Sequence, residues 1–450
     1  MPFKKLHIED KNTGEIVGNI SYSLLLKGGA LVVGFLTTPA YIRFFSSSSV
    51  LGVWFSILSV LNLMLFFDFG VGNGLRNVFV ELYSAGKNDR LKSYISTAYI
   101  YLTGICITII VLSVFLFRFI NWNALFNLSA DLLAPAIFAK GMTILFAGVM
   151  LQIALRLTSS LLLAMQNAAL PNLFALATNL FLLVGIALCN FTGHNDDFVF
   201  LSYLYVLSVT APLVLATVII FGTKLKNIRP TLHCFEPALV KEVGSTGNKF
   251  LVIQIAVQIL CGSVTAYAVN VFVDAANVVT YSLYYKVYHQ VFVVYGIILA
   301  PIWSAVTKAL VEERYEWLSK TVKKAALVGV AIFLAQFAVL PLMQTLFDIW
   351  LGADTITLSM TSLLLFTFGN GIILLLLFFF HICSGLGELD GQFLWGLIGG
   401  LAFVVLSYFL TKYARDYNTV VLAQTLAAIP YCAFEFVWLN KRLRKIGVQR

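Results

Sequence analysis

The chain has 450 residues, of which 60% are hydrophobic and only 11% carry a charged side chain. A soluble domain carries about 25% charged residues, so this composition excludes a soluble enzyme and predicts an all-α polytopic membrane protein. The formal net charge is +9. We attribute this excess to the orientation of the chain in the membrane, and we exclude nucleic acid as a partner.

Apolar runs of membrane-spanning length recur along the whole chain and predict about twelve transmembrane helices. Charged residues and turn residues set the expected ends of each helix. An even number of helices places both termini on one side of the membrane. The predicted helices cover residues 22–45, 51–73, 93–117, 134–162, 171–191, 198–222, 249–273, 278–305, 323–346, 358–384, 391–411 and 418–440.

Lysine and arginine gather in the loops and tails on the side that holds both termini. By the positive-inside rule, this bias predicts that both termini are cytoplasmic. The opposite side has far fewer basic residues, namely Arg43, Arg118, Lys412 and Arg415.

The longest predicted cytoplasmic loop, residues 223–248, lies between the sixth and seventh helices. It predicts an N-terminal six-helix bundle (1–222), a cytoplasmic linker (223–248) and a C-terminal six-helix bundle (249–450). Two similarly oriented halves are typical of transporters that carry substrate between two bundles. We therefore expect a central cavity between the bundles.

The stretch from Phe66 to Asn77, FFDFGVGNGLRN, combines the Asp-Phe-Gly signature of kinases with glycines like those of phosphate-binding loops. Neither interpretation holds, because the stretch closes an apolar run and follows no kinase strand or βαβ unit. Asp68 lies about one turn inside the cytoplasmic face, at the depth of Lys27 on the first helix. We expect Lys27 and Asp68 to form a gate ion pair, with snorkelling as the alternative for Lys27.

In the predicted helix 134–162, Arg156 shares a polar stripe with Gln152 and Ser159. A charge inside a span costs at least about 2.5 kcal/mol at the helix centre, so such a stripe is expected to face a wet cavity. Lys140 lies near the outer end of the same helix, where snorkelling explains it.

The seventh and eighth predicted helices carry further polar stripes. The seventh has two glutamines one turn apart, and the eighth, YSLYYKVYHQ, has tyrosines on one face with a lysine and a histidine at its edge. An aromatic belt at the outer membrane surface is the alternative for the tyrosines. The cavity residues predicted on these helices are Gln254, Gln258, Tyr285, Lys286, Tyr288 and His289.

Other chemistry-bearing residues point to no catalytic centre. The six cysteines are scattered singly, without metal or redox spacing, so we predict no metal site and no cofactor. Glu435 lies near the basic C-terminal tail and is expected to form an interfacial ion pair. Within the spans, basic residues outnumber the two acidic residues, Asp68 and Glu435, so the predicted cavity is cationic.

The N-terminal part of the sequence resembles the Wzx-type O-antigen flippases, in the polysaccharide-transporter branch of the multidrug/oligosaccharidyl-lipid/polysaccharide exporter superfamily. The resemblance covers the whole chain in architecture and is specific mainly from Gly18 to Ala98. Family members usually have Tyr-Gly-x-Trp where this sequence has Leu51-Gly52-Val53-Trp54. The family element Asp-x-Gly-x-Gly-Asn-Gly matches at Asp68, Gly70, Gly72, Asn73 and Gly74.

This resemblance implies a MATE-like fold and no enzymatic activity. It implies translocation of an undecaprenyl-diphosphate-linked oligosaccharide, an O-antigen or similar repeat unit, to the outer leaflet of a bacterial inner membrane. The partners would be this lipid-linked substrate and membrane lipid. Coupling to H⁺ or Na⁺ and contact with other polysaccharide-assembly proteins are left open.

A diphosphate carries negative charge, which Lys27, Arg156 and Lys286 would complement at low dielectric. The nearest alternative is a MATE-like exporter of small molecules, but one that selects cationic drugs should have mainly acidic residues in its spans. A membrane enzyme of polysaccharide assembly, a polymerase or ligase, is a second alternative. Such enzymes gather catalytic residues in a long outer loop, and the predicted outer loops here are short.

Overall fold

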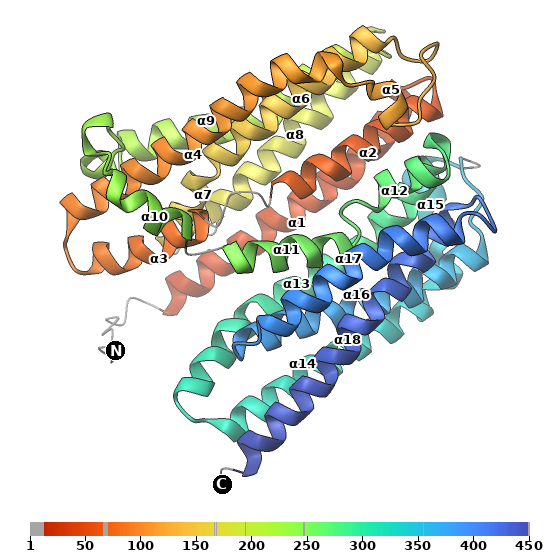
Figure 1. Cartoon of the computed structure of the whole chain (residues 1–450). Coiled ribbons are helices and arrows are strands. Elements are labelled where there is room, and N and C mark those ends of the chain that lie inside the picture. Colours follow the sequence, from red (N-terminus) through yellow and green to blue (C-terminus); the bar gives the residue numbers. More distant parts are fainter. Residues whose placement is uncertain are drawn as a thin grey trace. The chain divides into compact units, whose positions relative to one another are not determined.

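The structure is almost entirely helical, as the composition predicts (Figure 1). Throughout the described residues the regular elements are α-helices joined by short turns and 3₁₀ segments. The computed structural model describes residues 13–65, 71–165, 167, 169–193, 195–245, 248–353 and 355–448.

Most predicted spans agree with helices of the structure, but the predicted helix 51–73 does not, because one helix ends at Met64 and the next begins at Val71. In the part of the chain that is described, ten helices are long and apolar enough to cross a membrane. The bent pair α11 (Asn248–Leu260) and α12 (Thr265–Phe272) makes an eleventh if it is one span, and α2 (Ser48–Met64) is a shorter apolar helix of 17 residues. The prediction of about twelve membrane-crossing segments is therefore confirmed, and the chain is a multi-pass membrane protein.

The chain forms two compact units, each of which is assembled from several segments of the sequence. Unit 1 comprises Met1–Ala40, Gly70–Leu116 and Gly141–Thr246, and unit 2 comprises Tyr41–Phe69, Phe117–Lys140 and Gly247–Arg450. The described residues of the segments 41–65 and 117–140 thus pack with the C-terminal helices rather than with the N-terminal ones. The division of the chain into an N-terminal and a C-terminal six-helix bundle stays a prediction.

Unit 1 is a helical unit in which polar side chains tie neighbouring helices together. The Tyr99 hydroxyl bonds to that of Thr158 (2.8 Å), which in turn bonds to Thr217 (2.7 Å), so one chain of hydroxyls links three helices. Its elements are α1 (Thr13–Phe44, of which the last turn belongs to unit 2), α3 (Val71–Ser84), α4 (Asn88–Leu116), most of α6 (Pro135–Leu155), α7 (Leu157–Ala164), α8 (Ala169–Thr192), α9 (Phe198–Gly222), η2 (Lys226–Ile228), η3 (Leu232–Cys234) and α10 (Pro237–Ser245).

On the first helix Lys27, Gly34 and Thr38 share one polar stripe, and part of this stripe is a packing face. Asn179 on α8 donates from Nδ2 to the Ala30 carbonyl (2.7 Å), and Asn190 donates to the Ala40 carbonyl (3.1 Å). A Cβ added at Gly34 would stand 3.0 Å from Asn179 Nδ2, so this glycine lets α8 approach α1. This part of the stripe therefore serves helix packing.

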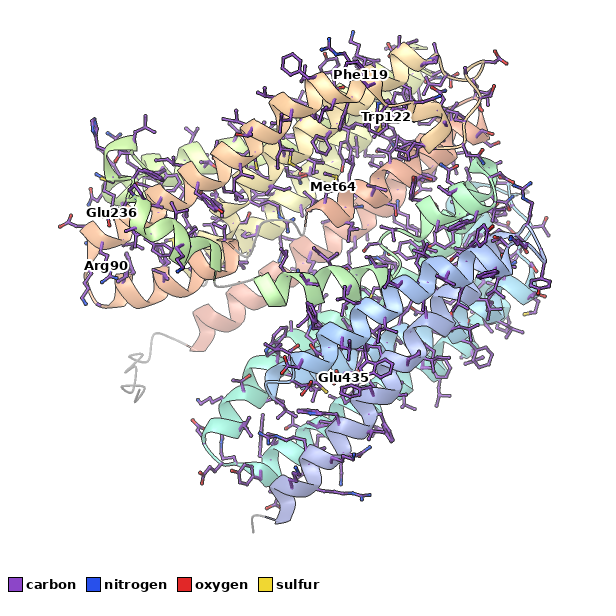
Figure 2. The ribbon with its side chains drawn as sticks, viewed as in Figure 1. Met64, Arg90, Phe119, Trp122, Glu236 and Glu435 are labelled. Carbon is purple, nitrogen blue, oxygen red and sulfur yellow. The ribbon has the colours of Figure 1, made fainter. Side chains whose placement is uncertain are left out.

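Residues 223–245, predicted as part of a cytoplasmic linker, are folded onto unit 1. The Thr231 amide donates to Ser96 Oγ (3.0 Å), and the Glu236 amide donates to Thr97 Oγ1 (3.0 Å). Both acceptors are fully buried on α4. Figure 2 shows Glu236 at the start of α10, beside α4. These bonds satisfy backbone donors that a free linker would leave to water.

Unit 2 contains the C-terminal helices together with α2, η1 (Phe117–Phe119) and α5 (Trp122–Leu125) from the N-terminal half. Its core is rich in buried phenylalanine and tyrosine, including Tyr281, Tyr284 and Phe379. Its elements are α2, η1, α5, α11, α12, α13 (Ala275–Val311), α14 (Tyr315–Val339), η4 (Leu340–Leu342), α15 (Met343–Leu351), α16 (Met360–Gly385), α17 (Asp390–Leu410) and α18 (Tyr417–Val448).

The Gly-x-Trp sequence of the second predicted helix has a packing role in unit 2. A Cβ at Gly52 would overlap the carbonyl oxygen of Ala275 at the start of α13, so only glycine permits this approach. Trp54 is fully buried, and its ring contacts Tyr41 and Phe45. The motif therefore joins α2 to α13 and to the end of α1.

Candidate functional site

The helix that crosses unit 2 as α11 and α12 is broken, and the two parts are bent by 55°. The Ser263 amide bonds to the Gln258 carbonyl (3.0 Å) and the Gly262 amide to the Ile259 carbonyl (3.1 Å), the pattern of a Schellman C-cap. Gly262 takes the left-handed conformation that this cap requires, with φ +97°. A broken helix within a span exposes backbone groups and often marks a binding site.

Side chains from other helices satisfy the groups freed at the break. Gln424 on α18 donates from Nε2 to the Leu260 carbonyl (2.9 Å), and its Oε1 accepts from the Thr265 hydroxyl (2.9 Å). From α2, the Ser59 hydroxyl donates to the Ser263 carbonyl and the Ser56 hydroxyl to the Ala266 carbonyl. Gln424 therefore holds both ends of the break with one amide group.

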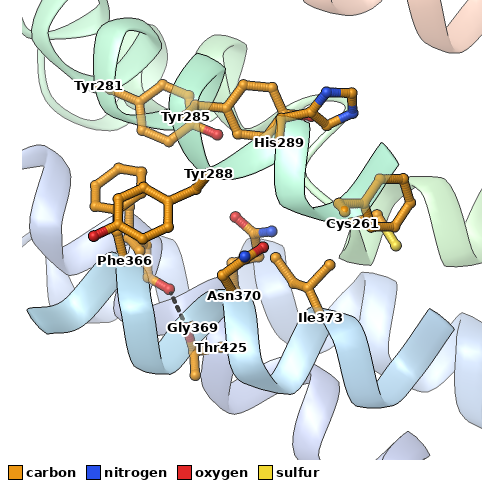
Figure 3. Close-up of a pocket in the computed structure, with 13 residues that line it drawn as sticks. Cys261, Tyr281, Tyr285, Tyr288, His289, Phe366, Gly369, Asn370, Ile373 and Thr425 are labelled. Carbon is orange, nitrogen blue, oxygen red and sulfur yellow. Dashed lines mark hydrogen bonds between the residues drawn. The ribbon is translucent and has the colours of Figure 1, made fainter. Parts of the chain in front are cut away.

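A narrow cavity lies inside unit 2 beside this break (Figure 3). It is formed by α13, α16 and α18 together with the end of α11, and its wall combines aromatic rings with neutral polar groups. The lining residues are Cys261, Tyr281, Tyr285, Tyr288, His289, Phe292, Phe366, Gly369, Asn370, Ile373, Val421, Gln424 and Thr425.

The aromatic wall of the cavity is a continuous series of ring contacts along α13. Tyr281 stacks on Tyr285 at 5.6 Å between centroids, and Tyr285 contacts His289 at 5.1 Å. Phe366 on α16 packs against the rings of Tyr281 and Tyr288. Residues spaced by three or four positions share one helix face, which is why these side chains meet.

The polar groups of the cavity are mostly paired within unit 2. The Tyr288 hydroxyl donates to the Leu363 carbonyl (2.9 Å) and lies 2.8 Å from the Thr367 hydroxyl. Asn370 donates from Nδ2 to Gln336 Oε1 (2.8 Å). These bonds fix the side chains of α13 and α16 and leave few polar atoms to bind a ligand.

The free volume of the cavity is about 30 Å³. This is enough for one water molecule or a small ion, and far too small for a sugar. None of its lining residues is acidic. The cavity in this arrangement is therefore a neutral site of water size next to a broken helix.

The structure brings together three of the residues predicted from the sequence: Tyr285, Tyr288 and His289. They line this internal cavity, and Tyr288 is only 5% exposed. The alternative of an aromatic belt at the membrane surface is thus wrong for Tyr288, because its ring and hydroxyl are enclosed by protein. Lys286, on the same helix, is half-buried and does not line the cavity.

Gln254 and Gln258 on α11 do not line this cavity either. Both are partly exposed. Gln258 accepts at Oε1 from the Ser263 hydroxyl (3.1 Å), so it belongs to the cap of α11. Their role in binding substrate stays a prediction.

The other predicted cavity residues belong to unit 1. Arg156 stands at the junction of α6 and α7, where its amide still bonds to the Gln152 carbonyl (2.9 Å), and its side chain is exposed. Gln152 and Lys27 are partly exposed. Because these residues lie in a different unit from Tyr285 and His289, a shared central cationic cavity stays a prediction.

The predicted gate ion pair concerns Lys27 and Asp68. Asp68 lies outside the described residues, as does Gly70 of the family element. Lys27 is half-buried on α1. The pair therefore stays a prediction.

Several cavity residues were not predicted, above all Gln424 and Thr425 on α18 and Asn370 on α16. Gln424 bonds to residues 159 and 164 positions away in the chain. The only sign of Gln424 in the sequence was a glutamine within an apolar run. Its partners could not be predicted, because the helix that it contacts is set by the fold.

Comparison with known proteins gives a match at the level of structure. No family model matches the chain, and no curated protein matches its sequence. A solved structure described as the inward-facing conformation of a multidrug resistance MATE family transporter of the MOP superfamily matches with a TM-score of 0.71 and 14% identity. The match covers 96% of this chain and 99% of that chain.

The chain has the fold of a MATE transporter. The outward-facing conformation of a MATE family transporter also matches, with a TM-score of 0.64, 14% identity and 96% of each chain covered. So does a MOP superfamily transporter from Pyrococcus furiosus, with a TM-score of 0.61, 15% identity and coverage of 98% and 100%. The MATE fold confirms the predicted fold class, and these solved structures are transporters and not enzymes.

Proposed function

We propose that the chain is a flippase for a lipid-linked oligosaccharide diphosphate of the undecaprenyl type. It would move this substrate from the cytoplasmic to the periplasmic leaflet of a bacterial inner membrane by alternating access. The fold of a membrane exporter supports transport. The distribution of basic residues supports an orientation with both termini in the cytoplasm.

The observation that carries the proposal is the exposed side chain of Arg156. It lies within the span Pro135–Ala164, away from both ends, and it is exposed. An ionised side chain at such a depth requires water or an anionic partner, because contact with lipid tails is costly. A guanidinium can hold two oxygens of a diphosphate in a fixed fork.

The charge balance favours an anionic substrate over a cationic one. Lys27 is partly exposed within a span and Arg156 is exposed within another, whereas Glu435 is fully buried. Away from the span ends, the charges that reach a surface in the described residues are therefore basic. An exporter of cationic drugs would need the opposite arrangement.

A MATE-like exporter of small molecules is the second candidate, because solved transporters of this fold are described as multidrug resistance proteins. The fold does not fix the charge of the substrate. For the Pyrococcus furiosus transporter, the reverse polarity of the binding pocket is described as suggesting a different function. A membrane enzyme of polysaccharide assembly has less support, since the cavity described above has no acidic residue or metal-binding set.

The test is to measure the leaflet in which lipid-linked sugar accumulates. Cells that lack the chain should accumulate lipid-linked repeat units in the inner leaflet, and the wild-type chain should restore them to the outer one. In parallel, the purified protein in proteoliposomes is assayed with a fluorescent prenyl-diphosphate sugar and with a cationic dye. Transport of the dye alone, with normal lipid-linked sugar in the deleted cells, would overturn the proposal in favour of a drug exporter.

A further inference from the structure

Glu435 on α18 is a buried carboxyl without a basic partner among the described residues. It is 0% exposed, and neither carboxyl oxygen has a hydrogen-bond partner among the described residues. The described residues also offer no lysine or arginine nitrogen at ion-pair distance from it. The expected interfacial ion pair with the basic tail is therefore wrong, because the side chain is fully buried and meets no basic group of the described residues.

Three helices enclose this carboxyl. The Cys383 thiol on α16 lies beside it, and Cys383 is itself 0% exposed. On α17, Gln392 is fully buried and accepts from the Ser384 hydroxyl at Oε1 (2.9 Å). Glu388, in the turn from α16 to α17, interacts with Glu435 and accepts from the Gly391 amide (2.6 Å).

The remaining titratable and charged groups nearby do not neutralise a negative charge on Glu435. Tyr431 and Cys432 lie one turn earlier on α18, and Arg442 lies two turns later on the same face. His381 on α16 bonds through Nδ1 to the Leu377 carbonyl and packs against Trp303. The exposed charged side chains at this end of the neighbouring helices lie on α13, α14 and α17 and in the turn from α13 to α14. They are Lys308, Glu312, Glu313, Arg314, Glu316, Lys320, Lys323, Lys324 and Asp390.

Burial of an unpaired charge costs several kcal/mol. The side chain of Glu435 is fully covered by neighbouring protein atoms, so water does not reach its carboxyl oxygens. Glu435 must therefore carry a proton in this arrangement. Two unpaired groups of unit 2, Gln392 Nε2 and the Tyr431 hydroxyl, are also fully buried. Both can donate a hydrogen bond, and Tyr431, which interacts with Glu435, is the donor within reach of a carboxylate formed there. Neither suits a metal ion, and the described residues contain no group of three metal-binding side chains.

The position of Glu435 makes exchange with water feasible. It lies six residues before Lys441, about 9 Å along the helix axis, on the span that ends at Lys445. The turn between α16 and α17 lies at the same end of unit 2, and Glu388 in that turn is partly exposed. A small separation of these three helix ends would let water reach the carboxyl.

We propose that Glu435 is a proton-binding site of unit 2. It holds one proton while α16, α17 and α18 are packed as in this structure, and it releases that proton to water when their ends separate. The site does not depend on the identity of the transported substrate. In the proposed flippase it would make the packing of this helix end respond to pH.

The test uses the full-length protein in lipid nanodiscs and follows the infrared carbonyl band of protonated carboxyls while the pH is raised. As the pH rises, wild type and Glu388→Gln should both lose a carbonyl band of protonated carboxyl. Glu435→Gln should lack this band at every pH. The folding equilibrium of wild type should also weaken by up to tenfold per pH unit relative to Glu435→Gln. Stability falls as the pH rises because Glu435 is neutral in the folded protein and ionises in the unfolded chain.

Two outcomes would overturn the proposal. One is a wild-type protein with no titrating protonated carboxyl, a result that needs no variant. The other is a Glu435→Gln variant that retains the same band and the same dependence of stability on pH. Because glutamine mimics the neutral carboxyl, Glu435→Gln is expected to fold. If it fails to fold while Glu435→Asp folds, the buried group is not neutral and the proposal is wrong.

Discussion

The two units treat polar side chains within the membrane in different ways. In unit 2, Gln424, Tyr288 and Asn370 are paired with other helices around a cavity of about 30 Å³. In unit 1, Arg156 presents an exposed charge at a helix junction whose backbone bonds are intact. The first arrangement maintains a fold, and the second leaves a charged group accessible to a ligand.

This contrast distinguishes polar groups that stabilise the fold from polar groups that can bind a ligand. A polar group that is buried and paired contributes mainly through the cost of unpairing it. An exposed cation within a span contributes little to folding and much to attracting an anion. Substitutions in unit 2 should therefore change stability first, and substitution of Arg156 should change transport first.

The largest expected effect is that of Arg156→Ala on transport. Loss of a charged hydrogen-bond donor to phosphate should lower the rate of lipid-linked sugar translocation by about 10- to 100-fold. Arg156→Lys should recover part of this loss, because it keeps the charge but not the fork. Rates are measured in proteoliposomes at equal protein content, with thermal unfolding of each variant alongside.

The matched control is Lys140→Ala, which removes an exposed basic residue from the start of the same helix. It should transport like wild type. Equal losses in Arg156→Ala and Lys140→Ala would show a general electrostatic effect, and a loss of stability in Arg156→Ala would make Arg156 structural.

The next largest effect is expected for Gln424→Leu on the stability of unit 2. The substitution leaves the Leu260 carbonyl and the Thr265 hydroxyl without their partner at the helix break. Each unsatisfied buried group costs about 1–3 kcal/mol, so the free energy of unfolding should fall by about 2–4 kcal/mol. Chemical or thermal unfolding in detergent measures this difference.

Thr425→Val is the control at the adjacent position. It removes only a hydroxyl that bonds within its own helix, to the Val421 carbonyl. Its cost should be below about 1 kcal/mol. Similar losses in both variants would mean that Gln424 does not hold the break.

The break itself illustrates what the sequence could and could not predict. Hydropathy located the ten long apolar helices of the described residues, because membrane-crossing length and apolar composition are local properties. The residues 249–273 were predicted as one helix, since a glycine such as Gly262 is common inside membrane helices. That Gly262 ends α11 depends on Gln424, which is distant in the chain and contacts the break only in the fold.

The candidate site was predictable to a similar extent. Tyr285, Tyr288 and His289 could be assigned to one face from helical spacing alone. Their partner Phe366 and the burial of Glu435 could not be predicted, because the pairing of α13, α16 and α18 is not encoded in any one segment. The depth of Glu435 suggested the tail as its partner, whereas its direction around the helix places it against α16 and α17.

Gly262→Ala should also destabilise unit 2, by about 1–3 kcal/mol. An alanine at φ +97° is strained, and its Cβ would lie 2.9 Å from the Tyr285 ring. Gly387→Ala provides the control, because Gly387 has a φ of +85° but open space around its Cβ position. Unfolding measurements should show a larger loss for Gly262→Ala, and the excess reports the contact with Tyr285. Equal losses would show that backbone strain accounts for the whole effect.

The smallest expected effect is that of Tyr288→Phe, which tests the pairing within the cavity by removing a single oxygen. The ring contact with Phe366 is kept, but the bonds to the Leu363 carbonyl and the Thr367 hydroxyl are lost. The free energy of unfolding should fall by about 0.5–1.5 kcal/mol.

Tyr285→Phe is the counterpart three residues earlier on the same helix face. The described residues provide no hydrogen-bond partner for the Tyr285 hydroxyl, so its removal should change the free energy of unfolding by less than about 0.5 kcal/mol. If Tyr285→Phe proved the more destabilising of the two, the Tyr285 hydroxyl would have to bind a water or an ion in the cavity. The neutral, paired character assigned to unit 2 would then be wrong at this position, and the cavity would join Arg156 as a binding site.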